Sequence, residues 1–105
     1  MATQRFRGMV DVLSSEGEVA AKAYCELVID ALGLGLEEWE GVLREVAPAG
    51  ALAGSHRYRL RLPNASEAEI VVNRTFARGQ GEEASAVYQF LGSGAPPSLV
   101  SAGGG

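Results

Sequence analysis

The segment Arg57-Tyr58-Arg59-Leu60-Arg61-Leu62 constrains the fold of this chain more than any other stretch. Its three arginines alternate with three bulky apolar residues. Successive side chains of a β-strand point to opposite faces, so the arginines share one face and the apolar residues share the other. We therefore predict a strand over 56–62 with one face in solvent and one in the core.

Two more strands are predicted after this one. The residues Pro63-Asn64-Ala65-Ser66 favour a turn, and an apolar segment follows at 68–76. The glycine-containing segment 77–83 predicts a looser turn before a third strand at 85–91. Together the three strands are expected to form an antiparallel meander.

The pairing register of the first hairpin follows from burial. A slip of one residue would move every side chain of a strand to the wrong face. We therefore expect Arg59 and Arg61 to share a face with the carboxylates of the second strand, Glu67 and Glu69. The opposite, buried face is expected to carry Tyr58, Leu60, Ile70 and Val72.

The N-terminal half carries patterns that indicate two helices. Ser15 followed by Glu18 fits a capping box, and Gly33 suits the position just after a helix. We predict a helix over 16–32, where one apolar face would hold Ala21, Tyr24, Leu27, Val28, Ala31 and Leu32, and where Lys22, Glu26 and Asp30 lie four residues apart on the other.

A second, shorter helix is predicted over 36–47, ending before Pro48. Its apolar residues follow helical spacing: Leu36, Trp39, Leu43 and Val46. Its acidic residues Glu37, Glu38 and Glu40 fall in the first turns, where the helix dipole favours negative charge. The segment 4–13 fits a helix or a strand, and Gly8 with the nearby valines favours the strand.

These elements predict an α+β fold in which a helical hairpin packs on one face of a three-stranded antiparallel meander, with an N-terminal fourth strand as an option. We expect one compact domain over 1–91 and a disordered Gly/Ser/Pro-rich tail over 92–105. The expected core contains Tyr24, Leu27, Val28, Leu32, Leu43, Val46, Tyr58, Leu60, Ile70, Val72, Tyr88 and Phe90.

Composition limits the classes of protein that remain. The chain has 105 residues, 47% of them hydrophobic, and a formal net charge of −4, as in an ordinary globular domain. The single cysteine excludes an internal disulfide and a cysteine-based metal cluster. The absence of a signal-like or membrane-spanning segment favours a cytoplasmic protein. We expect no cofactor and no metal.

No constellation of residues predicts catalysis. His56 adjoins Ser55, but neighbouring residues of a strand point to opposite faces and cannot act as a base and its nucleophile. Cys25 lies beside Glu26 in the middle of a predicted helix, at the edge of its apolar face, so we expect an inert small hydrophobic residue. An enzyme is therefore the least supported class, and we predict no catalytic residues.

The arginine stripe has three interpretations. Arg57, Arg59 and Arg61 could bind phosphates of a nucleic acid or another anionic ligand. They could instead form a protein interface. The cross-strand glutamates favour a third interpretation, a solvated sheet face whose charges are paired. The acidic charge of the whole domain also disfavours nucleic acid as the partner.

The leading functional hypothesis is a small non-enzymatic interaction or adaptor module that associates with a protein partner or with itself as a homodimer. The predicted strand 85–91 carries no charge, and an uncharged edge strand can pair with another chain. Its candidate interface residues are Tyr88, Phe90 and Leu91. We interpret Glu37, Glu38, Glu40 and Glu45 as a solvated face of the second predicted helix, and an acidic helix would also suit a basic partner. A small-molecule pocket lined by Trp39 or Tyr24 is a third possibility.

Overall fold

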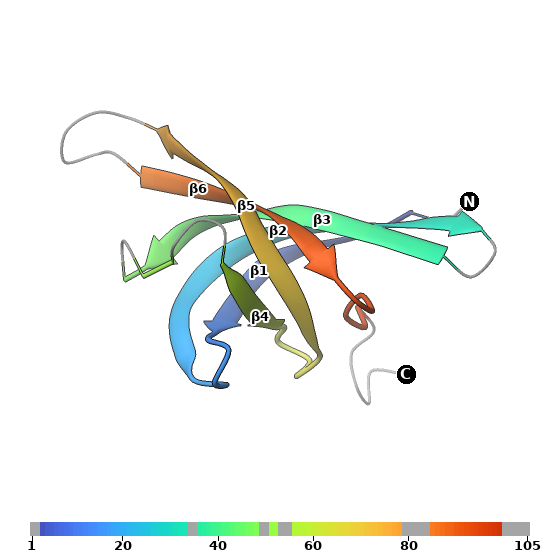
Figure 1. The fold of residues 1–105 in the computed structure, drawn as a ribbon, viewed down its shortest axis with the longest axis horizontal. Helices are drawn as coiled ribbons and strands as arrows, with labels where there is room; N and C mark the ends of the chain where they lie inside the picture. Colours follow the sequence, from blue (N-terminus) through green and yellow to red (C-terminus); the bar gives the residue numbers. More distant parts are fainter. Residues whose placement is uncertain (1–2, 34–35, 49–50, 53–55, 79–84, 100–105) are drawn as a thin grey trace.

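The structure, a computed structural model, describes residues 3–33, 36–48, 51–52, 56–78 and 85–99. These residues form six β-strands and no helix. The strands close into an antiparallel barrel in the order β1-β2-β3-β6-β5-β4 (Figure 1). Their bounds are β1 Thr3–Leu13, β2 Val19–Gly33, β3 Leu36–Ala47, β4 Arg57–Arg61, β5 Glu67–Arg78 and β6 Ser85–Ser93. No helix in this described part is long and apolar enough to cross a membrane.

The predicted α+β fold with a helical hairpin is therefore wrong, because the segments 16–32 and 36–47 form β2 and β3. The helix prediction over 16–32 rested in part on residues four positions apart, such as Lys22 and Glu26. Four is an even number, so such residues share a face in a strand as well as in a helix. Every odd position from Val19 to Ala31 is apolar, which is the alternation of a strand with one buried face.

The predicted helix cap is a hairpin turn between β1 and β2. The hydroxyl that accepts backbone amides belongs to Ser14, and its donors are the amides of Glu16 and Glu18, each at 3.3 Å. The amide of Ser14 donates to the carbonyl of Glu18 at 2.7 Å. Gly17 adopts a φ of 88°, which glycine reaches without steric cost. The same kinds of residue thus serve a turn and not a helix start.

The C-terminal strands agree with the prediction. The strands expected over 56–62, 68–76 and 85–91 correspond to β4, β5 and β6, and the segment 4–13 lies in β1. The hairpin register is also confirmed, because Arg59 pairs with Glu69 and Arg61 pairs with Glu67. The buried side of this hairpin faces the barrel interior, whereas we had expected it to face helices.

The core fills the inside of the barrel with alternate residues from all six strands. The largest fully buried side chains are Phe90, Leu27, Leu43, Leu60, Ile70, Val12, Val72 and Cys25. Of the predicted core, Tyr24, Val28, Val46 and Tyr58 are only partly buried. Tyr24 and Val28 occupy the even positions of β2 that face outward. The side chain of Leu32 lies outside the described residues. Trp39 was expected on a helix face and is 5% exposed in the core.

The barrel is closed along only part of its length, so the molecule is elongated, with extents of 46 × 27 × 23 Å. Among the described residues, β1 pairs with β4 only through Asp11–Leu13, and β3 pairs with β6 only through Glu40–Leu43. The β2–β3 hairpin and the β5–β6 hairpin project from opposite ends of the barrel (Figure 1). Parts of several strands therefore pair on one side only.

The structure describes the C-terminal segment as far as residue 99. β6 extends to Ser93, and the residues that follow contact the β4–β5 turn. The side-chain amide of Asn64 donates to the carbonyl of Ser98 at 2.8 Å, and the amide of Ser98 donates to the hydroxyl of Ser66 at 2.8 Å. Leu99 packs against the core. Residues 100–105 of the expected tail lie outside the described residues.

Candidate functional site

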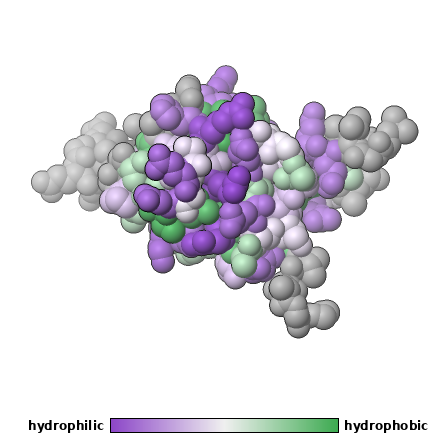
Figure 2. Space-filling model, turned by 60° about the horizontal axis from the view of Figure 1, so that its bottom comes forward, coloured by the Kyte–Doolittle hydropathy of each residue, from purple (hydrophilic) through white to green (hydrophobic). Residues whose placement is uncertain are grey.

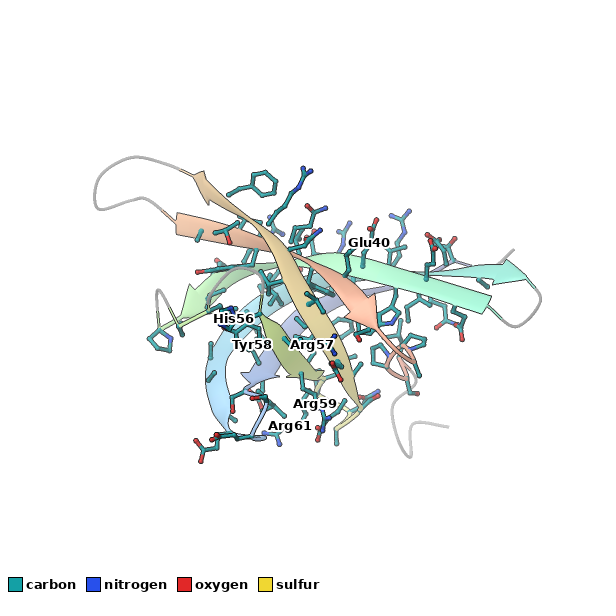
Figure 3. All side chains as sticks on the ribbon, viewed as in Figure 1. Glu40, His56, Arg57, Tyr58, Arg59 and Arg61 are labelled. Atoms are coloured by element: carbon teal, nitrogen blue, oxygen red, sulfur yellow. The ribbon has the colours of Figure 1, made fainter. Side chains whose placement is uncertain are left out.

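The three arginines singled out in the sequence follow one another along β4 on the outer face of the barrel (Figure 3). Each one forms an ion pair with a carboxylate of a neighbouring strand. Arg57 lies 2.9 Å from Glu69, and Arg59 lies 3.6 Å from Glu67. Arg61 pairs with Asp11 of β1 at 3.2 Å, across the seam that closes the barrel. The stripe therefore alternates in charge across three strands.

This pairing bears on the proposal of an anion site. A phosphate bound to these arginines would have to compete with three carboxylates that are already in place. Exposed pairs of this kind contribute little stability each, about 0.2–1 kcal/mol, so they mainly balance charge on a solvated face. The underside of the molecule is correspondingly hydrophilic, with smaller hydrophobic areas between the polar groups (Figure 2).

The structure separates the three candidate interface residues of β6. Tyr88 is 5% exposed and Phe90 is 0% exposed, whereas Leu91 is 44% exposed on the outer face. The segment from Tyr88 to Leu91 pairs with β3 on one side and with β5 on the other. It is thus a central part of the barrel wall, and its backbone has no edge to offer a partner.

His56 and Cys25, the two other side chains considered as reactive groups, lie in different surroundings. His56 lies just before β4, where its ring stacks on Tyr58 with centroids 6.5 Å apart. Cys25 is fully buried inside the barrel. Burial, with a smaller contribution from Glu26, raises the pKa of its thiol to about 12. In the described residues, no group of three His, Cys, Asp or Glu side chains could hold a metal ion.

The raised pKa of Cys25 predicts a specific loss of stability at alkaline pH. In the unfolded chain the thiol loses its proton near pH 9, whereas in the folded chain it keeps the proton until about pH 12. Between these values the unfolded state binds fewer protons, so the thiol lowers the free energy of unfolding by up to about 1.4 kcal/mol per pH unit.

Urea denaturation of the wild type and of Cys25→Ala between these pH values measures this slope. The variant should lose less stability per pH unit than the wild type, because other groups titrate equally in both. Equal slopes in the two proteins would contradict the assignment.

A groove lies at the edge of β3, where β6 leaves the barrel wall. Its volume is about 410 Å³, within the usual range of ligand sites. The ring of Trp39 lies against Gly92, where no Cβ would fit, and its indole nitrogen donates to the carbonyl of Gly94 at 3.1 Å. Leu91 lines the same groove. Four carboxylates complete the lining: Asp30, Glu37, Glu38 and Glu40.

Beside this groove, the described backbone of β3 pairs with a neighbouring strand on one side only. Residues Leu36–Trp39 of β3 pair with β2, and the β3–β6 ladder begins only at Glu40. Among the described residues, the ion pairs involve none of Glu37, Glu38 and Glu40. The first part of β3 therefore combines a free strand edge with uncompensated negative charge.

The N-terminal strand has the opposite charge. Residues Thr3–Val10 of β1 pair with β2, and only Asp11–Leu13 also pair with β4. Arg5 and Arg7 lie on this segment, and in the part of the chain that the structure describes neither takes part in an ion pair. Arg5 and Arg7 of β1 thus differ from the three arginines of β4, each of which has a carboxylate partner.

Reasoning from the sequence missed Arg5 and Arg7 as site residues. The signal was present, because Arg5-Phe6-Arg7-Gly8 alternates charged and uncharged residues in the same way as 57–62. The carboxylates of 36–40 were noticed as a group that suits a basic partner. Their position on a strand edge depended on the pairing of distant strands, which no local pattern reports.

Comparison with known proteins does not assign the chain to a family. No family model matches it, and neither a curated protein nor a solved structure matches it.

Proposed function

We propose that this protein is a non-enzymatic interaction module that binds an extended segment of a protein partner as an added strand along β3. The observation that carries the proposal is the edge Leu36–Trp39, which pairs on one side only within the part of the chain that the structure describes and borders the acid-lined groove. This assigns the interaction to β3, whereas the sequence had suggested β6.

An exposed strand edge is a ready template for another chain. Its free amides and carbonyls supply affinity for an extended segment, and the neighbouring side chains supply specificity. Native sheets commonly protect such edges with charge or a covering segment. Here the charges flanking the edge are all negative, so they repel acidic segments and admit basic ones.

The groove suits a segment that alternates basic and apolar residues. Basic side chains on one face would meet Glu38 and Glu40, which occupy alternate positions of β3. Apolar side chains would point to the opposite face, the face of Trp39, whose ring also lines the groove. Because the edge is only four residues long, we expect weak binding, with a Kd of about 10 μM to 1 mM.

An NMR titration of the isotopically labelled full chain tests this function. A peptide that alternates lysine and valine should shift the amide signals of 36–40, and raising the salt concentration should weaken the effect. A matched peptide that alternates glutamate and valine should leave these signals in place.

A charge-neutralising variant sharpens the test. Glu40→Gln should weaken binding of the lysine–valine peptide several-fold, because it removes one carboxylate beside the edge. Glu18→Gln, in the β1–β2 turn, makes the same change of charge elsewhere and should bind like the wild type. Binding that leaves the signals of 36–40 unmoved, or that both variants weaken equally, would overturn the proposal.

A further inference from the structure

The two half-paired edges belong to one three-stranded sheet. β1 and β3 flank β2 from opposite sides, so the segment Thr3–Val10 forms one border of this sheet and Leu36–Trp39 forms part of the other. The β1 border carries Arg5 and Arg7. The β3 border carries Glu38, with Glu40 at its end. One border is therefore basic and the opposite border is acidic.

The charged side chains of both borders lie on the same face of the sheet. Val28 of β2 is the register partner of Arg5 on one side and of Glu40 on the other. Residues directly opposite each other in a ladder project to the same face. Thr3, Asp30 and Glu38 form the next such row, in which the Thr3 hydroxyl donates to Asp30 at 3.0 Å.

We propose that the partner bound along β3 is a second copy of this chain, whose β1 edge adds to the sheet. This inference rests on the proposed function and names its partner. When β1 of one copy runs parallel to β3 of the other, the arginines of one copy stand on the same face of the continuous sheet as the carboxylates of the other. Oppositely charged cross-strand pairs of this kind stabilise a ladder, and none of the four groups has an ion-pair partner within the described part of its own chain.

The charges also select the mode of association. A twofold pairing of β1 with β1 would set arginines against arginines, and a pairing of β3 with β3 would set carboxylates against carboxylates, each of which is unfavourable. Pairing of β1 with β3 is heterologous, so it leaves one edge open on each end of the complex. Such contacts continue into rings or filaments and do not stop at a dimer.

Complementary charge reversal tests this arrangement. The wild type should form species larger than a dimer in sedimentation velocity at about 50 mM salt, and these should dissociate as screening increases toward about 500 mM. Arg5→Glu/Arg7→Glu and Glu38→Arg/Glu40→Arg should each weaken self-association at least about tenfold, since each sets like charges against each other.

Mixing the two variants is the decisive step. Each variant retains the edge that the other has lost, and the two altered edges are also complementary, so an equimolar mixture should assemble again. The neutral variants Arg5→Gln/Arg7→Gln and Glu38→Gln/Glu40→Gln should weaken association to a lesser degree. Arg74→Glu reverses a charge on β5, away from both edges, and should assemble like the wild type.

Three outcomes would overturn the inference. Assembly of Glu38→Arg/Glu40→Arg on its own, with loss only in the arginine variant, would indicate a contact between β1 edges. Assembly of both variants alone would place the contact elsewhere. A wild type that stays monomeric at millimolar concentration would exclude the second copy as the partner.

The lysine–valine peptide separates this failure from failure of the proposed function. If the monomeric wild type still binds the peptide at 36–40, the edge of β3 is a binding site and its partner is another basic segment. If it neither assembles nor binds the peptide, both the second copy and the strand-addition function are rejected.

Discussion

Gly41→Ala is expected to lower the free energy of unfolding by about 3 kcal/mol or more. Gly41 lies on the inner face of β3, where a Cβ would overlap the backbone oxygen of Glu26 on the neighbouring strand. It would also lie 2.7 Å from the ring of Phe90 and 2.9 Å from the α-carbon of Leu27. Because two of these contacts are with backbone atoms, the strands must separate to admit a single methyl group.

The same substitution has the opposite sign in the fold that the sequence suggested. In the middle of a helix over 36–47, alanine would be more favourable than glycine by about 1 kcal/mol. Urea denaturation of Gly41→Ala therefore distinguishes the barrel from the helical hairpin by the direction of the change alone. Glu40→Ala, at the exposed neighbouring position, is the control and should change stability by less than about 0.5 kcal/mol.

Phe90→Ala is expected to destabilise the protein by about 3–5 kcal/mol. Phe90 is fully buried at the centre of the barrel, and its ring meets that of Trp39 edge to face with centroids 6.2 Å apart. Its removal takes a large apolar surface out of contact and leaves a cavity that the closed wall of strands cannot easily collapse to fill. The loss is comparable to the whole stability of many small domains.

Leu91→Ala is the matched control for this substitution. The two residues are adjacent, but Leu91 is 44% exposed on the outside of the barrel, so its truncation should cost about 1 kcal/mol or less. The ratio of the two losses, measured by denaturant unfolding, reports which face of β6 is inside. Similar losses at both positions would contradict the placement of β6 as a central strand of the wall.

The distribution of charge connects the fold to the proposed interaction. The arginines of β4 form ion pairs with carboxylates of β1 and β5, so the charge on the outer surface of the closed part of the barrel is balanced. On the borders of the β1–β2–β3 sheet, Arg5, Arg7, Glu38 and Glu40 form no ion pair with the residues that the structure describes, and the two borders differ in sign. This contrast, and not the number of arginines, is the reason for placing the interaction at β1 and β3.

Much of the strand content could be derived from the sequence. In 56–62 the alternation of arginine and apolar residues is unambiguous, and burial of one face was sufficient to determine the register of the β4–β5 hairpin. These features are local, because adjacent residues alone decide which side of a strand is apolar. The burial of Cys25 agrees with the expectation of a small hydrophobic side chain, although it lies in a strand and not in a helix.

The sequence did not show in the same way whether the segments of β2 and β3 form strands or helices. The apolar residues of β2 satisfy both periods, and its alanines have a high intrinsic preference for helix. In β3, Leu36, Trp39, Leu43 and Val46 follow helical spacing and do not alternate. In the structure, Ala21 and Ala23 are small inward-facing residues that allow the opposite walls of a narrow barrel to approach. The choice between helix and strand was therefore made by packing against distant segments.

The sequence by itself determined which residues face inward along β4, β5 and β6, because the two-residue period of a strand is a property of neighbouring residues. Only the tertiary structure decided that β6 lies between β3 and β5, that Asp11 meets Arg61 at the seam, and that the free edges belong to β1 and β3. Closure of a barrel brings together strands that are far apart in the chain, and the location of an unpaired edge depends on where every other strand has found its partner.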